Sequence, residues 1–352
     1  MGEMEEIIFA DVVVRDGLKR KYFSPRDMRR LSHAVFSSRR AIQGLFAGKF
    51  RTRQSGQSIE FHDYREYLPG DQINHIDWKV YARTDRLFIK LFEHQTDLAV
   101  HLLVDRSRSM LFNGLMANGD SKYDFACRMA AAICFLVSKQ NDRFSFSTAS
   151  GGLVQHVSAG NSMQHLVHTL DEMERVRPAG DADLAAAVEQ LMETSRKKDL
   201  LCLFSDLLDE DLYQPDVDVG RKRQPNRRIE HPHTAVNSVP RSLIQVCKKW
   251  LQGGGEVVLF HIMHPDDIKL PDVDDATFYD LESNERVRVN ISAVRERFAK
   301  RVEEFLAGWA GGMRKIGVDY NLVRVSADFL PNLERFFSRR RDRLTSLRGR
   351  FA

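Results

Sequence analysis

The chain has 352 residues, of which 43% are hydrophobic and 29% are charged, as in ordinary globular proteins. Its net charge of +4 comes from 53 basic and 49 acidic residues, too even a balance to indicate nucleic-acid binding. No apolar run approaches the roughly eighteen residues of a membrane span, so we expect no membrane insertion. Four cysteines without disulfide-like spacing favour a reducing, cytoplasmic location.

The N-terminal part of the chain is predicted to hold one helix followed by a polar segment. Apolar residues recur at helical spacing over 27–45, and Ser24 and Pro25 precede them as a helix start. Residues 46–57 are basic and contain glycine, which is typical of an exposed connection.

Residues 58–90 are the densest polar segment of the chain. The pattern predicts strands at 59–61 and 87–92, a turn at 68–71 and a helical turn within 73–82. Charged side chains alternate here with aromatic ones, which favours an ion-paired clasp against the main sheet over a set of acid–base catalysts. We therefore expect Trp78 to be buried against the sheet domain.

A short apolar run over 98–104 is typical of a buried central strand, and it ends at Asp105. Asp105, Ser107 and Ser109 then form a D-x-S-x-S loop. Ligands of open α/β sheets bind at this carboxyl edge of the strands. Carboxylate and hydroxyl oxygens suit Mg²⁺, although a serine-rich turn explains the same residues.

Two sequence stretches carry a family resemblance: EFHDYREYLPGDQINHIDWKVYARTDRLFIKLFE at 60–93 and VDRSRSM at 104–110. They resemble domain of unknown function 58, a bacterial family with a von Willebrand factor A-like domain. SKYDFA, FSDLLDE and HPDDIKLPDVDDATFYDLESNERV agree as well, so the resemblance covers about residues 25–340. It implies an α/β fold with a doubly wound, mostly parallel sheet flanked by helices, beside a smaller N-terminal region.

The resemblance also implies a metal-ion-dependent adhesion site built from three loops at one sheet edge. The first loop gives Asp105, Ser107 and Ser109, and the third gives Asp206. The second loop usually supplies a threonine, but this chain has Ala182 there, and the neighbouring Asp181 is the substitute that we expect. The expected ion is Mg²⁺, with Mn²⁺ able to replace it.

The rest of the chain alternates strands and helices, which predicts a parallel sheet. Strands are expected at 143–148, 153–157, 200–204, 256–261 and 318–325, and helices at 121–139, 163–174, 184–195, 243–251, 294–309 and 330–337. A hairpin is expected around 278–289. Residues 214–240 have the composition of a flexible surface insertion.

We therefore predict three parts: 1–95, an N-terminal helix and family-signature region; 96–338, the von Willebrand factor A-like domain; and 339–352, a basic tail. The resemblance implies a non-enzymatic, metal-dependent interaction module that works with a MoxR-type AAA+ ATPase, in a chaperone-like or assembly role. The chain has no G-x-x-x-x-G-K-[ST] motif, so the partner would supply the ATPase. The alternatives are a metal-dependent hydrolase that uses Asp105, Asp206 and the polar cluster at 60–85, and nucleic-acid binding through the basic residues 219–228 of the insertion and the basic tail.

Overall fold

The computed structural model describes residues 20–34, 36, 59–67, 78–84, 86–94, 99–115, 119–196, 198–208, 242–279 and 286–348. The chain forms two compact units: Met1–Phe36 with Leu98–Ser338, and Ser37–Asp97 with Arg339–Ala352. The first unit takes in the helix α2 (Pro25–Leu31), whereas the prediction placed residues 1–95 in one N-terminal region. The predicted insertion at 214–240 lies outside the described residues.

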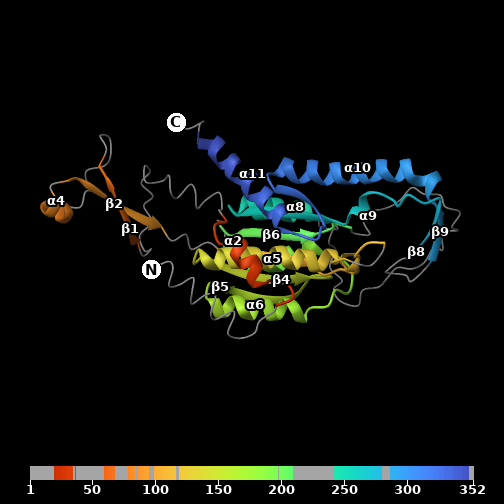
Figure 1. Cartoon of the computed structure of the whole chain (residues 1–352), viewed down its shortest axis with the longest axis horizontal. Helices are drawn as coiled ribbons and strands as arrows, with labels where there is room; N and C mark the ends of the chain where they lie inside the picture. The colour runs from red at the N-terminus through yellow and green to blue at the C-terminus, as the bar shows by residue number, and fades with distance from the viewer. Residues whose placement is uncertain are drawn as a thin grey trace. The chain divides into compact units, whose positions relative to one another are not determined.

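A six-stranded sheet with the order β10-β7-β6-β3-β4-β5 forms the centre of the first unit (Figure 1). All neighbouring strands run parallel except β5, which pairs antiparallel with β4 at one edge. The bounds are β3 Ala99–Asp105, β4 Arg143–Ala149, β5 Leu153–Gly160, β6 Leu200–Ser205, β7 Glu256–Met263 and β10 Asp319–Arg324. After β3 the chain continues to β4, the neighbour of β3 on one side, and only later forms β6, its neighbour on the other side. The switch point of the topology therefore lies between β3 and β6.

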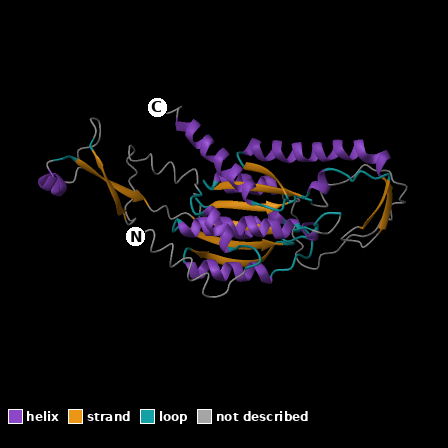
Figure 2. Ribbon diagram, in the orientation of Figure 1, coloured by secondary structure: helices purple, strands orange, loops and turns teal. Residues whose placement is uncertain are grey.

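Helices cover both faces of this sheet (Figure 2). One face packs against α5 (Lys122–Lys139) and α6 (Met163–Arg175), and the other against α7 (Leu184–Thr194), α8 (Leu243–Gln252) and α10 (Ile291–Ile316). Because both faces are covered, β3, β6 and β7 are buried along their whole length, as their apolar runs predict. This confirms the predicted doubly wound, mostly parallel sheet flanked by helices.

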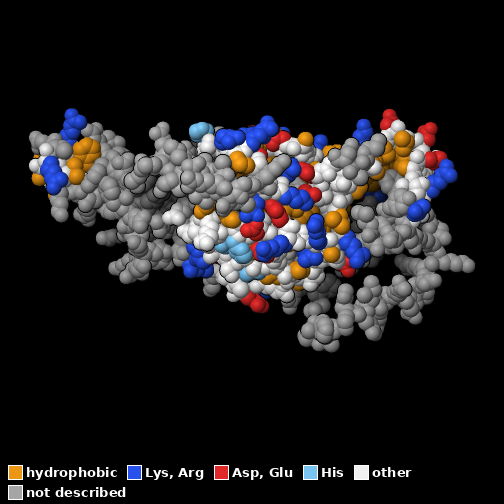
Figure 3. All heavy atoms as spheres, turned by 60° about the horizontal axis from the view of Figure 1, so that its bottom comes forward, with side chains coloured by type: hydrophobic (Ala, Val, Ile, Leu, Met, Phe, Trp, Pro, Cys, Tyr) orange, Lys and Arg blue, Asp and Glu red, His pale blue; other side chains and the backbone are white. Residues whose placement is uncertain are grey.

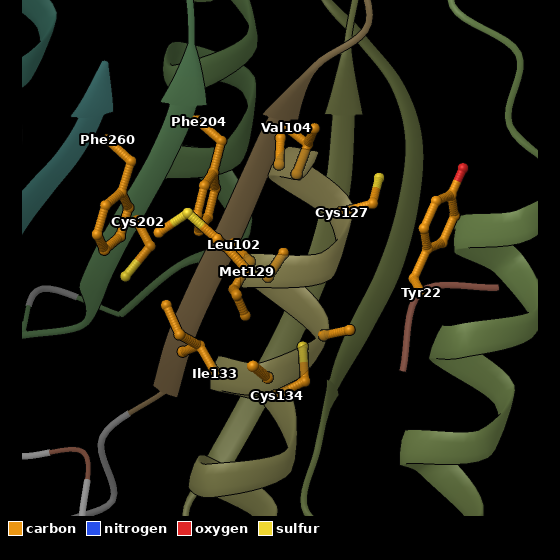
Figure 4. Packing of buried hydrophobic residues seen from close by; sticks show 14 of the residues in the cluster. Tyr22, Leu102, Val104, Cys127, Met129, Ile133, Cys134, Cys202, Phe204 and Phe260 are labelled. Carbon is orange, nitrogen blue, oxygen red and sulfur yellow. The ribbon is translucent and has the colours of Figure 1, made fainter. Parts of the chain in front are cut away.

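Helix α5 is the main cover of the central strands. It begins after Ser121, whose side chain accepts a hydrogen bond from the Asp124 N–H at 3.0 Å and so caps the helix. Met129 and Ile133 pack with Leu102 of β3 (Figure 4). Complete burial of such a side chain contributes about 1.5–3 kcal/mol, so this helix fixes the position of the strands beneath it.

The helix α2 is shorter than predicted. Ser24 and Asp27 form a capping box at its start, but the helix ends at Leu31 with Ser32 as its C-cap. Residues 37–45 of the predicted helix lie outside the described residues.

The C-terminal elements of the first unit include the predicted hairpin, formed by β8 (Asp275–Tyr279) and β9 (Arg286–Asn290). Helix α9 (Pro265–Ile268) is one short turn, whereas α11 (Leu330–Arg348) runs through most of the segment predicted as a basic tail. Of the helices that the structure describes, none combines the length and apolarity needed to cross a membrane.

In the second unit, β1 (Ile59–Glu66) pairs antiparallel with β2 (Phe88–His94), and α4 (Trp78–Thr84) lies between them in sequence. Trp78 is 58% exposed and Tyr81 is 38% exposed, with their ring centroids 6.0 Å apart. Within its own unit the ring of Trp78 packs edge-on against that of Tyr81 and is largely open, so nothing that the structure describes in this unit buries it.

Candidate functional site

The carboxyl ends of β3 and β6 bring the first and third loops together. These strands are parallel neighbours, with Val104 opposite Phe204, so the residues that follow them meet at one edge. Asp105 is fully buried there. Its Oδ1 accepts a hydrogen bond from the Ser107 N–H at 2.8 Å, and its Oδ2 accepts one from the Ser205 hydroxyl at 2.6 Å.

The two serines of the first loop continue this network to Asp206. The hydroxyls of Ser107 and Ser109 are 3.1 Å apart, and Ser109 donates to Asp206 Oδ1 at 3.1 Å. Four residues predicted from the sequence therefore lie together. Burial, together with the charge of Asp206, raises the pKa of Asp105 to about 6.

The third loop is held in a sharply defined conformation. Leu207 adopts a left-handed backbone with φ 55°, and its N–H donates to the Ser205 hydroxyl at 2.9 Å. His261 of the neighbouring strand β7 also holds this loop. Its Nε2 lies 2.9 Å from the Asp206 carbonyl oxygen, and its Nδ1 lies 2.7 Å from the Tyr320 hydroxyl. Burial lowers the pKa of His261 to about 4, so the ring is neutral at physiological pH.

The second loop contacts the first through its backbone. The Arg108 N–H donates to the Gly180 carbonyl oxygen at 3.1 Å, and the Ala179 N–H donates to the Arg106 carbonyl oxygen at 2.8 Å. The Asp181 side chain is exposed, and among the described residues no hydrogen bond or ion pair joins its carboxylate to this network. The structure thus does not bring the predicted substitute ligand to the other four.

Sequence reasoning missed a buried cation in the centre of the site. Lys122 is 1% exposed, and its Nζ lies 2.7 Å from Asp206 Oδ2 and 3.0 Å from Asp267 Oδ2. Burial lowers the pKa of Lys122, but the two carboxylates outweigh it, so the pKa is raised and the ammonium is charged. The signal was available: Lys122 lies three residues before Phe125 and seven before Met129, on the buried stripe of α5.

The oxygen atoms that the three loops bring to this edge fit a divalent cation poorly. Ala182 brings no oxygen ligand from its side chain, and Lys122 already neutralises Asp206. A divalent ion bound to Asp206 would also lie close to the ammonium group, which repels it.

A second polar network lies deeper in the sheet. His101 of β3 has its Nδ1 2.7 Å from the Ser145 hydroxyl and its Nε2 2.9 Å from Asp199 Oδ2. The order Ser–His–Asp is that of a hydrolytic triad. Ser145 is fully buried inside β4, however, so its hydroxyl cannot reach a substrate. The network pairs polar groups within the core.

The model of the family described as protein of unknown function DUF58 matches residues 63–225. An uncharacterized protein of Mycobacterium tuberculosis is 27% identical over 304 residues, which cover 85% of each chain. An uncharacterized protein of Mycobacterium avium is 24% identical over 185 residues, covering 52% of this chain and 91% of the relative.

Two solved structures are also similar. One is the conserved hypothetical protein BatB from Bacteroides thetaiotaomicron, with a TM-score of 0.41 and 11% identity over 71% of this chain and 99% of that one. The other is an aerotolerance-related membrane protein from Bacteroides fragilis, with a TM-score of 0.37 and 13% identity over 67% and 96%. The family match agrees with the resemblance inferred from the sequence: residues 63–225, which include the D-x-S-x-S loop, are similar to the DUF58 family.

Proposed function

We propose that this chain is a non-enzymatic protein–protein interaction module that binds a MoxR-type AAA+ ATPase through the carboxyl edge of its sheet. The observation that carries the proposal is the rigid first loop. Met110 is fully buried and anchors it, while Leu111 and Leu115 on the same segment are 44% and 43% exposed. A loop that is fixed before binding and presents apolar side chains loses little conformational freedom when a partner covers it.

Hydrogen bonds keep this loop in place over its length. The Met110 N–H donates to the Ser107 carbonyl oxygen at 3.1 Å, and the Leu115 N–H donates to Asp266 Oδ2 at 2.9 Å. The loop lies at the topological switch point, where α/β sheets bind their ligands. The ATPase as partner rests on the family resemblance, and the cytoplasmic location is supported by four buried free cysteines.

The two alternatives have less support. A metal-dependent hydrolase at Asp105 and Asp206 needs a metal ion that activates water, but the carboxylate of Asp206 is already paired with the Lys122 ammonium group. Nucleic-acid binding needs a surface of one charge sign. On the face shown in Figure 3, basic and acidic side chains of the described residues are interspersed instead.

The test is a binding measurement between the purified chain and each MoxR-type ATPase of the same organism. Leu111→Asp combined with Leu115→Asp should lower the affinity at least tenfold, because both changes place charge on the covered surface. Val273→Asp is the matched control, since Val273 is 45% exposed but lies beyond α9, outside the three loops. Failure of the wild-type chain to bind any of these ATPases would overturn the proposal.

A further inference from the structure

We infer that the ammonium group of Lys122 takes the place of a divalent cation at this edge, so that partner binding requires no metal. The inference builds on the proposed function, because it states how the binding edge is held together. It contradicts the prediction of a magnesium site at this edge, so metal binding by the wild-type chain would overturn it.

The geometry of Lys122 is that of a shared counter-ion. Its Nζ bridges Asp206, which follows β6, and Asp267 in α9. Asp206 is fully buried and the side chain of Asp267 is 18% exposed, so this ion pair is largely shielded from solvent. The Lys122 N–H also donates to the Phe112 carbonyl oxygen at 3.0 Å, and Nζ lies 5.6 Å from the centre of the Phe112 ring.

The result is one continuous path of polar contacts across the edge. It runs from the Ser107 hydroxyl through Ser109 to Asp206, and from Asp206 through Lys122 to Asp267. The path connects four elements: the first loop, the third loop, the start of α5 and α9. A bound metal ion would join loops by contacting their oxygens, and the ammonium group makes the corresponding connection with a single charge that cannot dissociate from the chain.

The charge of Lys122 is compatible with the absence of a side-chain oxygen at Ala182. A covalently attached cation needs no hydroxyl from the second loop. That loop instead contacts the first through backbone hydrogen bonds at Gly180 and Ala179.

The experiment compares Mn²⁺ binding by calorimetry and thermal unfolding with and without Mn²⁺, on the full chain after chelation. The wild-type chain should bind no Mn²⁺ at this edge and keep its melting temperature. Lys122→Gln should melt at a lower temperature and regain part of the loss in Mn²⁺, because Asp206 and Asp267 then lack a counter-ion. Lys249→Gln is the control, since Lys249 is an exposed lysine on α8.

Two results would overturn the inference: wild-type Mn²⁺ binding that Asp105→Ala abolishes, or a folded Lys122→Gln that gains no response to Mn²⁺. The wild-type titration decides the matter even if Lys122→Gln does not fold. The metal measurements use the chain alone, so they remain decisive if no ATPase binds. Where an ATPase does bind, its affinity should be the same with Mg²⁺ and with a chelator, and a loss of binding in the chelator would also overturn the inference.

Discussion

Asp199 offers the sharpest test of whether the buried Ser–His–Asp network is structural. Its carboxylate accepts hydrogen bonds from the Ala99 N–H at 3.1 Å, the Arg196 N–H at 2.8 Å and His101 Nε2 at 2.9 Å. Asp199→Ala leaves all three groups without this acceptor. Each unsatisfied buried group costs about 1–3 kcal/mol, so we expect the free energy of unfolding to fall by about 3–5 kcal/mol.

The measurement is urea-induced unfolding followed by circular dichroism, with two comparison variants. Asp183→Ala removes one exposed cap bond, from the Ala186 N–H at 2.9 Å, and should cost about 1 kcal/mol. Ser145→Ala removes one bond to His101 and should cost about 1–2 kcal/mol. A loss for Asp199→Ala no larger than that for Asp183→Ala would refute the reasoning. Hydrolytic turnover that disappears in Ser145→Ala would refute the structural role itself.

The same carboxylate predicts a dependence of stability on pH. Burial raises the pKa of Asp199, but the hydrogen bond from His101 and those from the backbone outweigh it, so the pKa is lowered overall. A lowered pKa stabilises the folded state above the ordinary value of about 3.9, and this stability is lost as the pH falls through the folded pKa. Asp199→Asn should therefore be less stable at neutral pH and should lose less stability on acidification below about pH 4, measured by thermal unfolding across the acid range.

Three further predictions concern single positions. Gly180→Ala should lower the free energy of unfolding by about 2–4 kcal/mol, because Gly180 has φ 82° and an added Cβ would overlap the Ser150 hydroxyl. Adding Ser150→Gly to this variant should remove the overlap but not the backbone strain, and urea titration of the double variant measures how much stability returns. Trp78→Ala should change the melting temperature little, with a stability effect within about 0.5 kcal/mol, and a large loss would show that the exposed ring is covered in solution. Ala182→Thr should gain no Mn²⁺ binding in calorimetry while Lys122 is present, whereas a gain would favour the magnesium prediction.

The sheet and the meeting of the first and third loops could be predicted from the sequence. The apolar runs before Asp105 and Asp206 are typical of strands in a parallel sheet that is covered on both faces. Once both strands are parallel, their carboxyl ends share an edge. The start of the helix predicted at 121–139 could also be read from the sequence, because the Ser121 cap contacts a residue only three positions away.

What escaped prediction depends on contacts between distant residues. The exposure of Trp78 follows from which surfaces pack against it, and an aromatic-rich composition does not say which surfaces those are. His261 lies within an apolar strand, and its role depends on Tyr320, 59 residues away. The basic residues after Ser338 read as a tail, but they continue α11.

Charge balance explains why the edge needs a cation of some kind. Asp105 and Asp206 follow neighbouring strands and are both fully buried, and two carboxylates in such a place destabilise one another. Hydrogen bonds from Ser107 and Ser205 satisfy Asp105, but they bring no positive charge. Lys122 supplies that charge from the first position of α5, the element that also covers the central strands. The cation at this edge is therefore fixed by the same packing that builds the sheet, and a change at Lys122 should alter the binding edge while the distant strand β5 keeps its pairing.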